Sequence, residues 1–277
     1  MEAFEEVGYC VITLSDPSPI HAIRVRLLEE LRGLIGNSHV TLESYHEIIG
    51  DHDDQHIAIQ FRLTEMLREH KWHLPIFQKN LCLFADLVGP DLDVQSAPYL
   101  RIVRPGKTQD NIGYHRDTVY GGSPYELSVF VPFVELEAGA ALCVEPGSHS
   151  KGEPEIPFIR MENPDKGVVK GSMKHKLGYP YAPQVLDEGY PVNMLPIPLH
   201  LGQVLAFSLA TLHGTIVNTS ETTRWTSDVR IKNAFAPVGA RASADLYMAL
   251  ARSHATKAAQ KYLQANESQD VSANEKV

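Results

Sequence analysis

Residues 98–235 consist of short apolar stretches separated by glycine and proline. Several of these stretches are rich in β-branched residues, and their length is typical of β-strands. The stretches that we expect to form strands are 98–104, 127–136, 140–144, 204–209, 211–217 and 222–235. Many short strands with glycine- and proline-containing turns are typical of a sandwich, a jelly roll or a barrel. The sequence therefore predicts a β core over this region.

Helical patterns flank the β region on both sides. Leucine and isoleucine recur at helical spacing, which predicts helices over 20–35, 53–70, 73–88 and 242–264, after a first strand at 5–15. No internal repeat and no long linker divides the chain, so we expect a single domain over residues 1–265. Residues 150–197 are rich in proline, glycine and charge and are expected to form long loops that could act as a lid. Residues 266–277 are expected to be a disordered polar tail.

Composition excludes several classes of function. The net charge of −9 and the lack of a lysine and arginine cluster argue against nucleic-acid binding. No apolar run reaches the roughly 18 residues of a membrane span, and the acidic N-terminus does not resemble a signal peptide. Cys10, Cys82 and Cys143 are widely spaced, which fits a reducing compartment. We expect a cytoplasmic protein that acts on a small molecule, and a homodimer is compatible with this reading.

One stretch has the form of a metal-binding motif. His115 and Asp117 are separated by one residue, and His213 follows about a hundred residues later. Side chains at i and i+2 of an extended segment point to the same face, so one short segment can offer an imidazole and a carboxylate to one metal. About one such tripeptide is expected by chance. The second one, His52-Asp53-Asp54, lies in a polar run at a helix start, where we interpret it as a solvated N-terminal cap.

The region around the distal histidine predicts a second functional feature. Residues 218–221 are suited to a four-residue loop between two strands. In a regular hairpin Thr215 would face Arg224, and His213 would face Thr226, all on one strand face. Burying an arginine costs several kcal/mol unless an anion or hydrogen-bond partners meet it. A dicarboxylate such as 2-oxoglutarate would satisfy this arginine, but an internal acid or a register shift remains an alternative.

These residues occur in a combination that resembles a known family. The matching segments are His115-Arg116-Asp117, residues 139–149 with their Pro146-Gly147-Ser148-His149 turn, Leu212-His213-Gly214, and Arg224. Together they cover roughly residues 98–235. The chain resembles the phytanoyl-CoA dioxygenase-like branch of the Fe(II)/2-oxoglutarate-dependent oxygenases. The resemblance implies a mainly β fold, the double-stranded β-helix (a cupin-like jelly roll), with flanking α-helices.

The resemblance also implies a metal and a cosubstrate site. His115, Asp117 and His213 would bind Fe(II) and act in catalysis. Halogenating relatives lack the carboxylate, so the presence of Asp117 favours oxygenation.

For the cosubstrate, Arg224 would bind the distal carboxylate of 2-oxoglutarate. Thr215, Thr226 and Arg101 are expected to assist it.

Other residues are expected to contact the substrate. Tyr114 flanks the metal motif, and Arg230 lies on the strand face of Arg224 and could reach the substrate or a structural acid such as Asp228. Tyr179, Tyr181 and Tyr190 lie in the predicted loops and could close over the substrate.

The expected function is oxidation of a C–H bond of a small polar molecule in secondary metabolism. The family consumes O2 and converts 2-oxoglutarate to succinate and CO2, so these are the expected cosubstrates and products. Two alternatives remain open at this point. One is a cupin-type metalloenzyme that does not use 2-oxoglutarate, and the other is a family member that binds a ligand without turnover.

Overall fold

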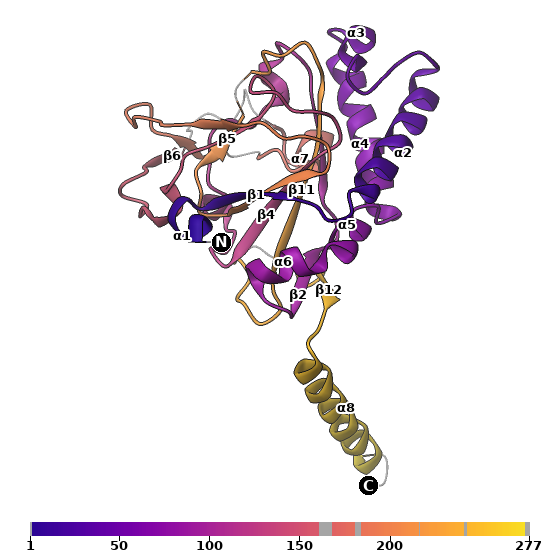
Figure 1. Ribbon diagram of the computed structural model, residues 1–277, viewed down its shortest axis with the longest axis vertical. Helices are drawn as coiled ribbons and strands as arrows, with labels where there is room; N and C mark the ends of the chain where they lie inside the picture. The colour runs from indigo at the N-terminus through magenta and orange to yellow at the C-terminus, as the bar shows by residue number, and fades with distance from the viewer. Residues whose placement is uncertain (1, 161–167, 181–183, 216, 241–242, 275–277) are drawn as a thin grey trace.

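The computed structural model describes residues 2–160, 168–180, 184–215, 217–240 and 243–274 (Figure 1). Its centre is a large antiparallel sheet. In spatial order this sheet contains β1 (Tyr9–Thr13), β9 (Gln203–Ser208), β4 (Glu126–Pro132), β11 (Arg224–Asn233), β2 (Leu92–Gln95) and β12 (Tyr247–Ala251), and β3 (Tyr99–Val103) also pairs with β11. Because β11 pairs with β2, β3 and β4, it forms the middle of the sheet.

A smaller sheet has the order β10-β5-β8. Its strands are β10 (His213–Gly214), β5 (Leu142–Val144) and β8 (Leu195–Ile197), and a separate pair is formed by β6 (Phe158–Arg160) and β7 (Gln184–Leu186). The predicted strands at 98–104, 127–136, 140–144 and 204–209 are confirmed within a few residues as β3, β4, β5 and β9. The short strand β2 was not predicted, because its four residues give too little alternation to stand out.

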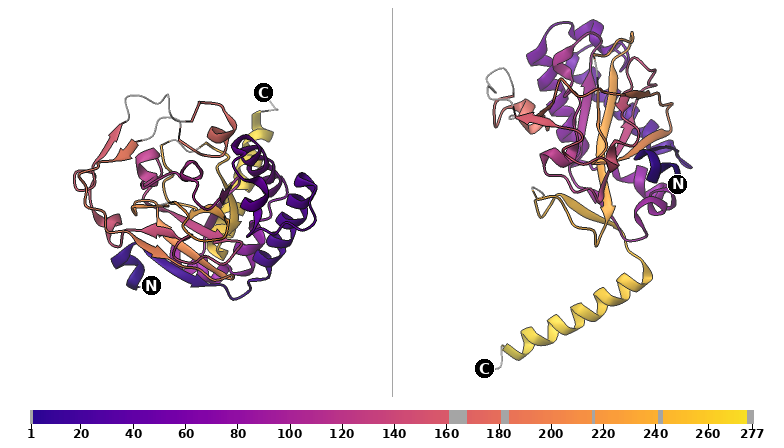
Figure 2. Two further views of the ribbon diagram at one scale, coloured as in Figure 1. Left: turned by 90° about the horizontal axis from the view of Figure 1, so that it is seen from above. Right: turned by 90° about the vertical axis from the view of Figure 1, so that its left-hand side faces the viewer.

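Helices cover one side of the larger sheet, as both views in Figure 2 show. They are α2 (Ser18–Ile35), α3 (Tyr45–Ile49), α4 (Asp53–Glu69), α5 (Leu74–Lys79) and α6 (Leu81–Val88). The predicted helices at 20–35 and 53–70 are confirmed as α2 and α4. The helix α2 ends where Gly36 adopts a left-handed conformation, with φ of 71°. The buried side chain of Gln60 donates to the carbonyl oxygen of Leu100 at 2.9 Å, which joins α4 to β3.

The prediction of one helix over residues 73–88 is wrong, because Asn80 divides it into α5 and α6. The Asn80 side chain is buried, accepts from the backbone N–H of Asp16 at 2.8 Å and donates to the carbonyl oxygens of Asp16 and Ile76. An asparagine that bonds to backbone groups in this way competes with helix hydrogen bonds. The side-chain contact with a distant loop therefore sets the break.

Both ends of the chain differ from the prediction. The expected strand at 5–15 begins with a helix, α1 (Glu2–Val7), and only its second part forms β1. The expected helix at 242–264 is also wrong at its start, where β12 adds an edge strand to β2. The helix α8 (His254–Asn274) follows, capped by Ser253, whose hydroxyl accepts from the N–H of Thr256 at 3.2 Å. It projects from the body and continues into the predicted tail (Figure 1).

The predicted hairpin after His213 is wrong. The short strand β10 pairs with β5, with His213 opposite Val144, whereas β11 pairs with β3, with Thr226 opposite Arg101. The loop after β10 therefore crosses from the smaller sheet to the larger one. Asn218 holds this crossing, since its side-chain amide donates to the carbonyl oxygen of Val103 at 3.2 Å.

The described residues of the segment 150–197 include more secondary structure than predicted. It contains β6, β7, β8 and the short helix α7 (Met173–Lys176), of which β8 completes the smaller sheet. Tyr179 is buried, and Tyr190 bonds to Glu145 at 2.6 Å. Tyr181 lies outside the described residues.

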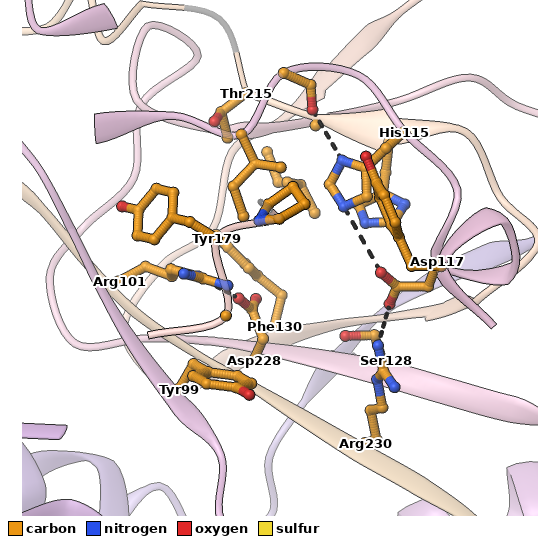
Figure 3. A pocket seen from close by; sticks show the side chains of 18 of the residues that line it. Tyr99, Arg101, His115, Asp117, Ser128, Phe130, Tyr179, Thr215, Asp228 and Arg230 are labelled. Atoms are coloured by element: carbon orange, nitrogen blue, oxygen red, sulfur yellow. Dashed lines mark hydrogen bonds and ion pairs between the residues drawn. The ribbon is translucent and has the colours of Figure 1, made fainter. Parts of the chain in front are cut away.

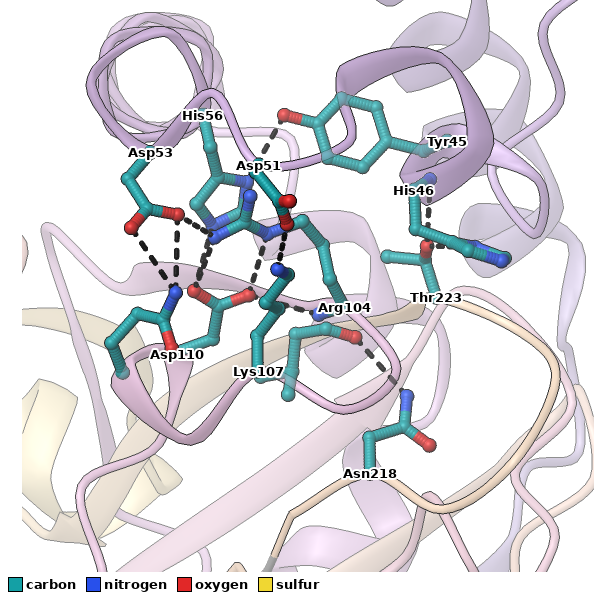
Figure 4. A network of polar contacts seen from close by, with 12 residues as sticks. Tyr45, His46, Asp51, Asp53, His56, Arg104, Lys107, Asp110, Asn218 and Thr223 are labelled. Atoms are coloured by element: carbon teal, nitrogen blue, oxygen red, sulfur yellow. Dashed lines mark hydrogen bonds and ion pairs between the residues drawn. The ribbon is translucent and has the colours of Figure 1, made fainter.

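A polar network joins the helical layer to the loop before His115 (Figure 4). The buried guanidinium of Arg104 contacts both oxygens of Asp110 at 2.9 Å and one oxygen of Asp53 at 2.6 Å. Asp53 lies in the first turn of α4 with a half-exposed side chain, as the prediction of a solvated cap implies, but it also neutralises a buried cation. Removing either acid would leave buried charge without its full compensation.

Among the described residues, no helix has both the length and the apolar character needed to cross a membrane.

The buried histidine at the start of α5 predicts a pH dependence of stability. Burial lowers the pKa of His73 to about 4, and its Nε2 donates to the carbonyl oxygen of Gln95 at 3.0 Å. In the unfolded chain a histidine has a pKa of about 6.5. Between about pH 6.5 and 4 the unfolded state binds the proton and the folded state does not, so the free energy of unfolding falls as the pH falls.

We expect His73→Gln, which keeps a donor but does not titrate, to reduce this slope by about 1.4 kcal/mol per pH unit. Urea unfolding at several pH values measures it. The exposed His21→Gln is the matched control and should keep the wild-type slope. An unchanged slope in His73→Gln would contradict the assignment.

Candidate metal centre

The two histidines of the predicted triad are held side by side by the backbone. The N–H of His115 donates to the carbonyl oxygen of His213 at 2.8 Å, and the reverse bond is 2.9 Å long. Gly214 makes this close approach possible. A Cβ atom at this position would lie only 2.3 Å from the carbonyl oxygen of Gly113. The glycine of the Leu212-His213-Gly214 motif is therefore a steric requirement for bringing the two imidazoles together.

The Nδ1 atoms of both imidazoles are hydrogen-bonded to backbone carbonyl oxygens. Nδ1 of His115 lies 2.9 Å from the carbonyl oxygen of Gly113, and Nδ1 of His213 lies 2.9 Å from that of Thr211. Because a carbonyl oxygen only accepts, each Nδ1 carries the proton. Each Nε2 then has a free lone pair, which is the arrangement that metal-binding histidines use.

Asp117 completes the group at the start of a short 3-10 helix, Asp117–Tyr120. Its Oδ1 lies 3.6 Å from Nε2 of His115, and the ligand atoms of His115, Asp117 and His213 all lie within 4.8 Å of one another. Across the part of the chain that the structure describes, no other group of this kind occurs. Two imidazoles and one carboxylate fit a non-haem Fe(II) site, in which further coordination positions stay open.

The protonation states of these groups suit a divalent cation. Burial and, second to it, the neighbouring His213 lower the pKa of His115 to about 4. Burial also lowers the pKa of His213. For Asp117, burial alone would raise the pKa, but Arg230 and the two imidazoles outweigh it and hold it below its usual value. At neutral pH the three residues therefore present two neutral imidazoles and one carboxylate.

The triad lines a cavity of about 520 Å³ between the two sheets (Figure 3). The smaller sheet contributes His213 and Leu142, and the larger sheet contributes Phe130, Phe207 and the polar residues of β11. The ring of Phe207 lies 4.5 Å from the His213 ring, centroid to centroid. The metal group therefore lies against an apolar wall.

Arg224 lines the same cavity and is 4% exposed. Its Nη1 donates to the carbonyl oxygen of Ala140 at 3.3 Å, and its Nη2 lies 3.5 Å from the hydroxyl of Thr215. Its Nε is buried and has no hydrogen-bond partner. Burial lowers the pKa of this guanidinium to about 10. Among the described residues no carboxylate forms an ion pair with Arg224. The alternative that Arg224 pairs directly with an internal acid is therefore not observed.

The other residues predicted for the cosubstrate lie in different settings. Thr215 lines the cavity, and its hydroxyl donates to Asn111 at 2.5 Å. Thr226 is fully buried, does not line the cavity and has a hydroxyl without a partner. Arg101 lines the cavity, but its charge is met by Asp228 at 3.4 Å.

Of the two residues predicted to contact substrate, one lines the cavity and the other does not. Tyr114 is not among the residues that line the cavity. Arg230 does line it, and its Nη2 lies 3.3 Å from Oδ2 of Asp117. Its partner is thus the carboxylate of the metal group, whereas Asp228, which the sequence offered as a partner, pairs with Arg101.

The contacts of two cavity residues, Asp228 and Tyr99, were not predicted from the sequence. Asp228 faces the cavity beside Arg101, and burial raises its pKa. It could have been found from the period of two in β11, which puts it on the face of Arg224 and Arg230. Tyr99 stacks on Arg101, with 5.3 Å between the guanidinium carbon and the ring centre, and no pattern in the sequence indicates this contact.

No family model and no curated protein matches the chain. Several solved structures are similar to it. Apo ThoJ, a non-heme monooxygenase, is 18% identical, with a TM-score of 0.49 over 91% of this chain and 83% of its own. EvdO2 from Micromonospora carbonacea var. aurantiaca, complexed with 2-oxoglutarate, is 16% identical, with a TM-score of 0.48 over 89% and 94%.

SnoN, a non-heme alpha ketoglutarate dependent epimerase from nogalamycin biosynthesis, is 14% identical, with a TM-score of 0.47 over 90% and 96%. Similarities at this level do not assign a reaction to the chain.

The close approach at Gly214 predicts that Gly214→Ala weakens metal binding. The added methyl group would push β10 away from residues 113–115 and separate the two imidazoles. We expect the affinity for Mn(II) or Co(II) to fall at least about tenfold, as for other changes that disturb ligand orientation. Calorimetric titration measures the affinity.

Gly33→Ala is the matched control, since a Cβ atom there meets open space on α2. It should bind metal as the wild type does. Wild-type affinity in Gly214→Ala would show that the backbone approach does not control the site.

Proposed function

We propose that the chain is an Fe(II)- and 2-oxoglutarate-dependent oxygenase with a double-stranded β-helix core, related to the phytanoyl-CoA dioxygenase-like branch. His115, Asp117 and His213 bind the metal, and Arg224 binds the distal carboxylate of 2-oxoglutarate. The substrate is a small polar molecule of secondary metabolism, and its C–H bond is oxidised while 2-oxoglutarate is converted to succinate and CO2.

The observation that carries this proposal is the buried charge of Arg224. Three arginines line the cavity, and two of them have acidic partners: Arg101 pairs with Asp228, and Arg230 pairs with Asp117. Arg224 has no such partner among the described residues. Asp228 compensates the charge of Arg224 only through space, and a buried cation without a direct ion pair is unfavourable, so an anion that enters the cavity would be bound there.

The position of Arg224 relative to the triad limits which anion fits. Thr215 follows the metal-binding strand β10 by one residue, and its hydroxyl lies 3.5 Å from Nη2 of Arg224. The guanidinium and the metal group are therefore close neighbours in one cavity. A five-carbon dicarboxylate with a 2-oxo group can place one carboxylate on Arg224 and offer its other carboxylate and oxo oxygen to the metal.

When bound, the metal supplies Lewis acidity and the redox chemistry with O2. The protein orients the cosubstrate through Arg224 and limits access of water through Phe130 and Phe207. The polar side of the cavity, with Gln95, Ser128 and Asp228, is available to a substrate that carries hydroxyl or amino groups.

The role of Arg224 predicts that Arg224→Met weakens 2-oxoglutarate binding. Loss of one charged hydrogen-bonded contact should raise the Kd about 10- to 100-fold. Calorimetry with the Mn(II)-loaded protein under anaerobic conditions measures it. Metal affinity itself should stay within about twofold, because Arg224 contacts none of the three ligands.

A matched ligand provides the control. 2-Oxobutanoate lacks the distal carboxylate, so Arg224→Met should change its affinity little. Equal losses for both ligands would show that Arg224 does not act through the distal carboxylate, and no loss for 2-oxoglutarate would argue for the alternative of a metalloenzyme that uses no 2-oxoglutarate.

Turnover separates the enzyme from a ligand-binding protein. With Fe(II), 2-oxoglutarate and ascorbate, the wild type should release succinate, and His115→Ala should release it at least about 100-fold more slowly. Tight binding of 2-oxoglutarate without any succinate across a panel of polar substrates would favour the non-catalytic alternative. Succinate at the wild-type rate from His115→Ala would refute the triad.

A further inference from the structure

The two oxygens of Asp117 have different partners (Figure 3). Oδ1 lies 3.6 Å from Nε2 of His115, on the side of the metal group. Oδ2 lies 3.3 Å from Nη2 of Arg230. One oxygen of the carboxylate therefore faces an imidazole, and the other pairs with a guanidinium.

Arg230 is itself held in place by its surroundings. Its Nη1 lies 4.0 Å from Oε2 of Glu126, a buried acid whose Oε1 accepts from the N–H of Gly239 at 2.9 Å. Its backbone lies in the middle of the larger sheet, opposite Ser128 of β4. The side chain therefore spans two acids, Asp117 and Glu126, from a rigid strand.

We propose that Arg230 is a positioning residue that keeps Asp117 a one-oxygen metal ligand, an inference that rests on the proposed metal site. A carboxylate can bind a cation through one or both oxygens. Oδ2 is paired with Arg230, whereas Oδ1 lies beside Nε2 of His115, so Oδ1 is the oxygen placed to bind the metal. The same ion pair restricts the rotation of the carboxylate, because turning it would separate Oδ2 from the guanidinium.

The consequence concerns the number of open positions. Three protein atoms leave three positions of an octahedral metal, whereas a two-oxygen Asp117 would leave two. A chelating 2-oxo acid needs two positions, so the third remains free only if Asp117 uses one oxygen. Arg230 would therefore affect the binding of 2-oxoglutarate through the metal, unlike Arg224, which contacts the cosubstrate itself.

The test counts the water molecules on bound Mn(II). Water-proton relaxivity per bound Mn(II), measured without 2-oxoglutarate, depends on the number of exchangeable waters. In Arg230→Met the free Oδ2 can bind the metal and displace one of three waters. We expect the relaxivity to fall by about one third.

Arg101→Met is the matched control. It also removes a guanidinium from the cavity, but Arg101 contacts Asp228 and not Asp117. Its relaxivity should equal that of the wild type. Wild-type relaxivity in Arg230→Met, or an equal fall in Arg101→Met, would overturn the proposal.

Loss of Arg230 leaves Glu126 buried without its cation, which could prevent folding. The double variant Arg230→Met/Glu126→Gln removes that charge, keeps an acceptor for Gly239 and serves the same test. The two proposals fail separately. Absence of Mn(II) binding by the wild type would refute the metal site, whereas wild-type binding with unchanged relaxivity in both variants would refute the role of Arg230 alone.

Discussion

The paired backbone bonds between His115 and His213 are the interaction on which the site depends. They join a loop that follows β3 to a strand of the smaller sheet, across about a hundred residues of sequence. Only a glycine at position 214 permits this approach. The Arg104 network holds the preceding loop against α4, so the helical layer also supports the metal group. The fold thus converts two distant motifs into one ligand set.

The charges of β11 organise the rest of the cavity. Along one face of this strand lie Arg224, Asp228 and Arg230, and each has a different charged partner or none. Arg230 is paired with the metal carboxylate, and Asp228 compensates Arg101 from β3. Arg224 alone among the cavity arginines described here is left without an acid. We propose that the anionic cosubstrate binds at the unpaired charge of Arg224, and the paired charges form the remaining polar walls of the cavity.

Much of this site could be predicted from the sequence, although the predicted pairing of its strands was wrong. The triad residues and Arg224 line one cavity, but a hairpin does not bring them together, because β10 joins β5 and the Asn218 loop crosses between sheets. Strand pairing is decided by tertiary contacts that local turn patterns do not contain. For the same reason helical patterns failed at β12, where pairing with β2 overrides local propensity. The pairing of Arg230 with Asp117 joins residues from separate segments, so no spacing reveals it.

We propose that one cavity binds a metal and a 2-oxo diacid at adjoining positions. Calorimetric titration of 2-oxoglutarate into the protein with and without saturating Mn(II), under anaerobic conditions, tests it most directly. Because the ligand would contact both Arg224 and the metal, we expect Mn(II) to raise the affinity for 2-oxoglutarate at least about tenfold, a coupling of about 1.4 kcal/mol or more. The same affinity with and without Mn(II) would contradict it.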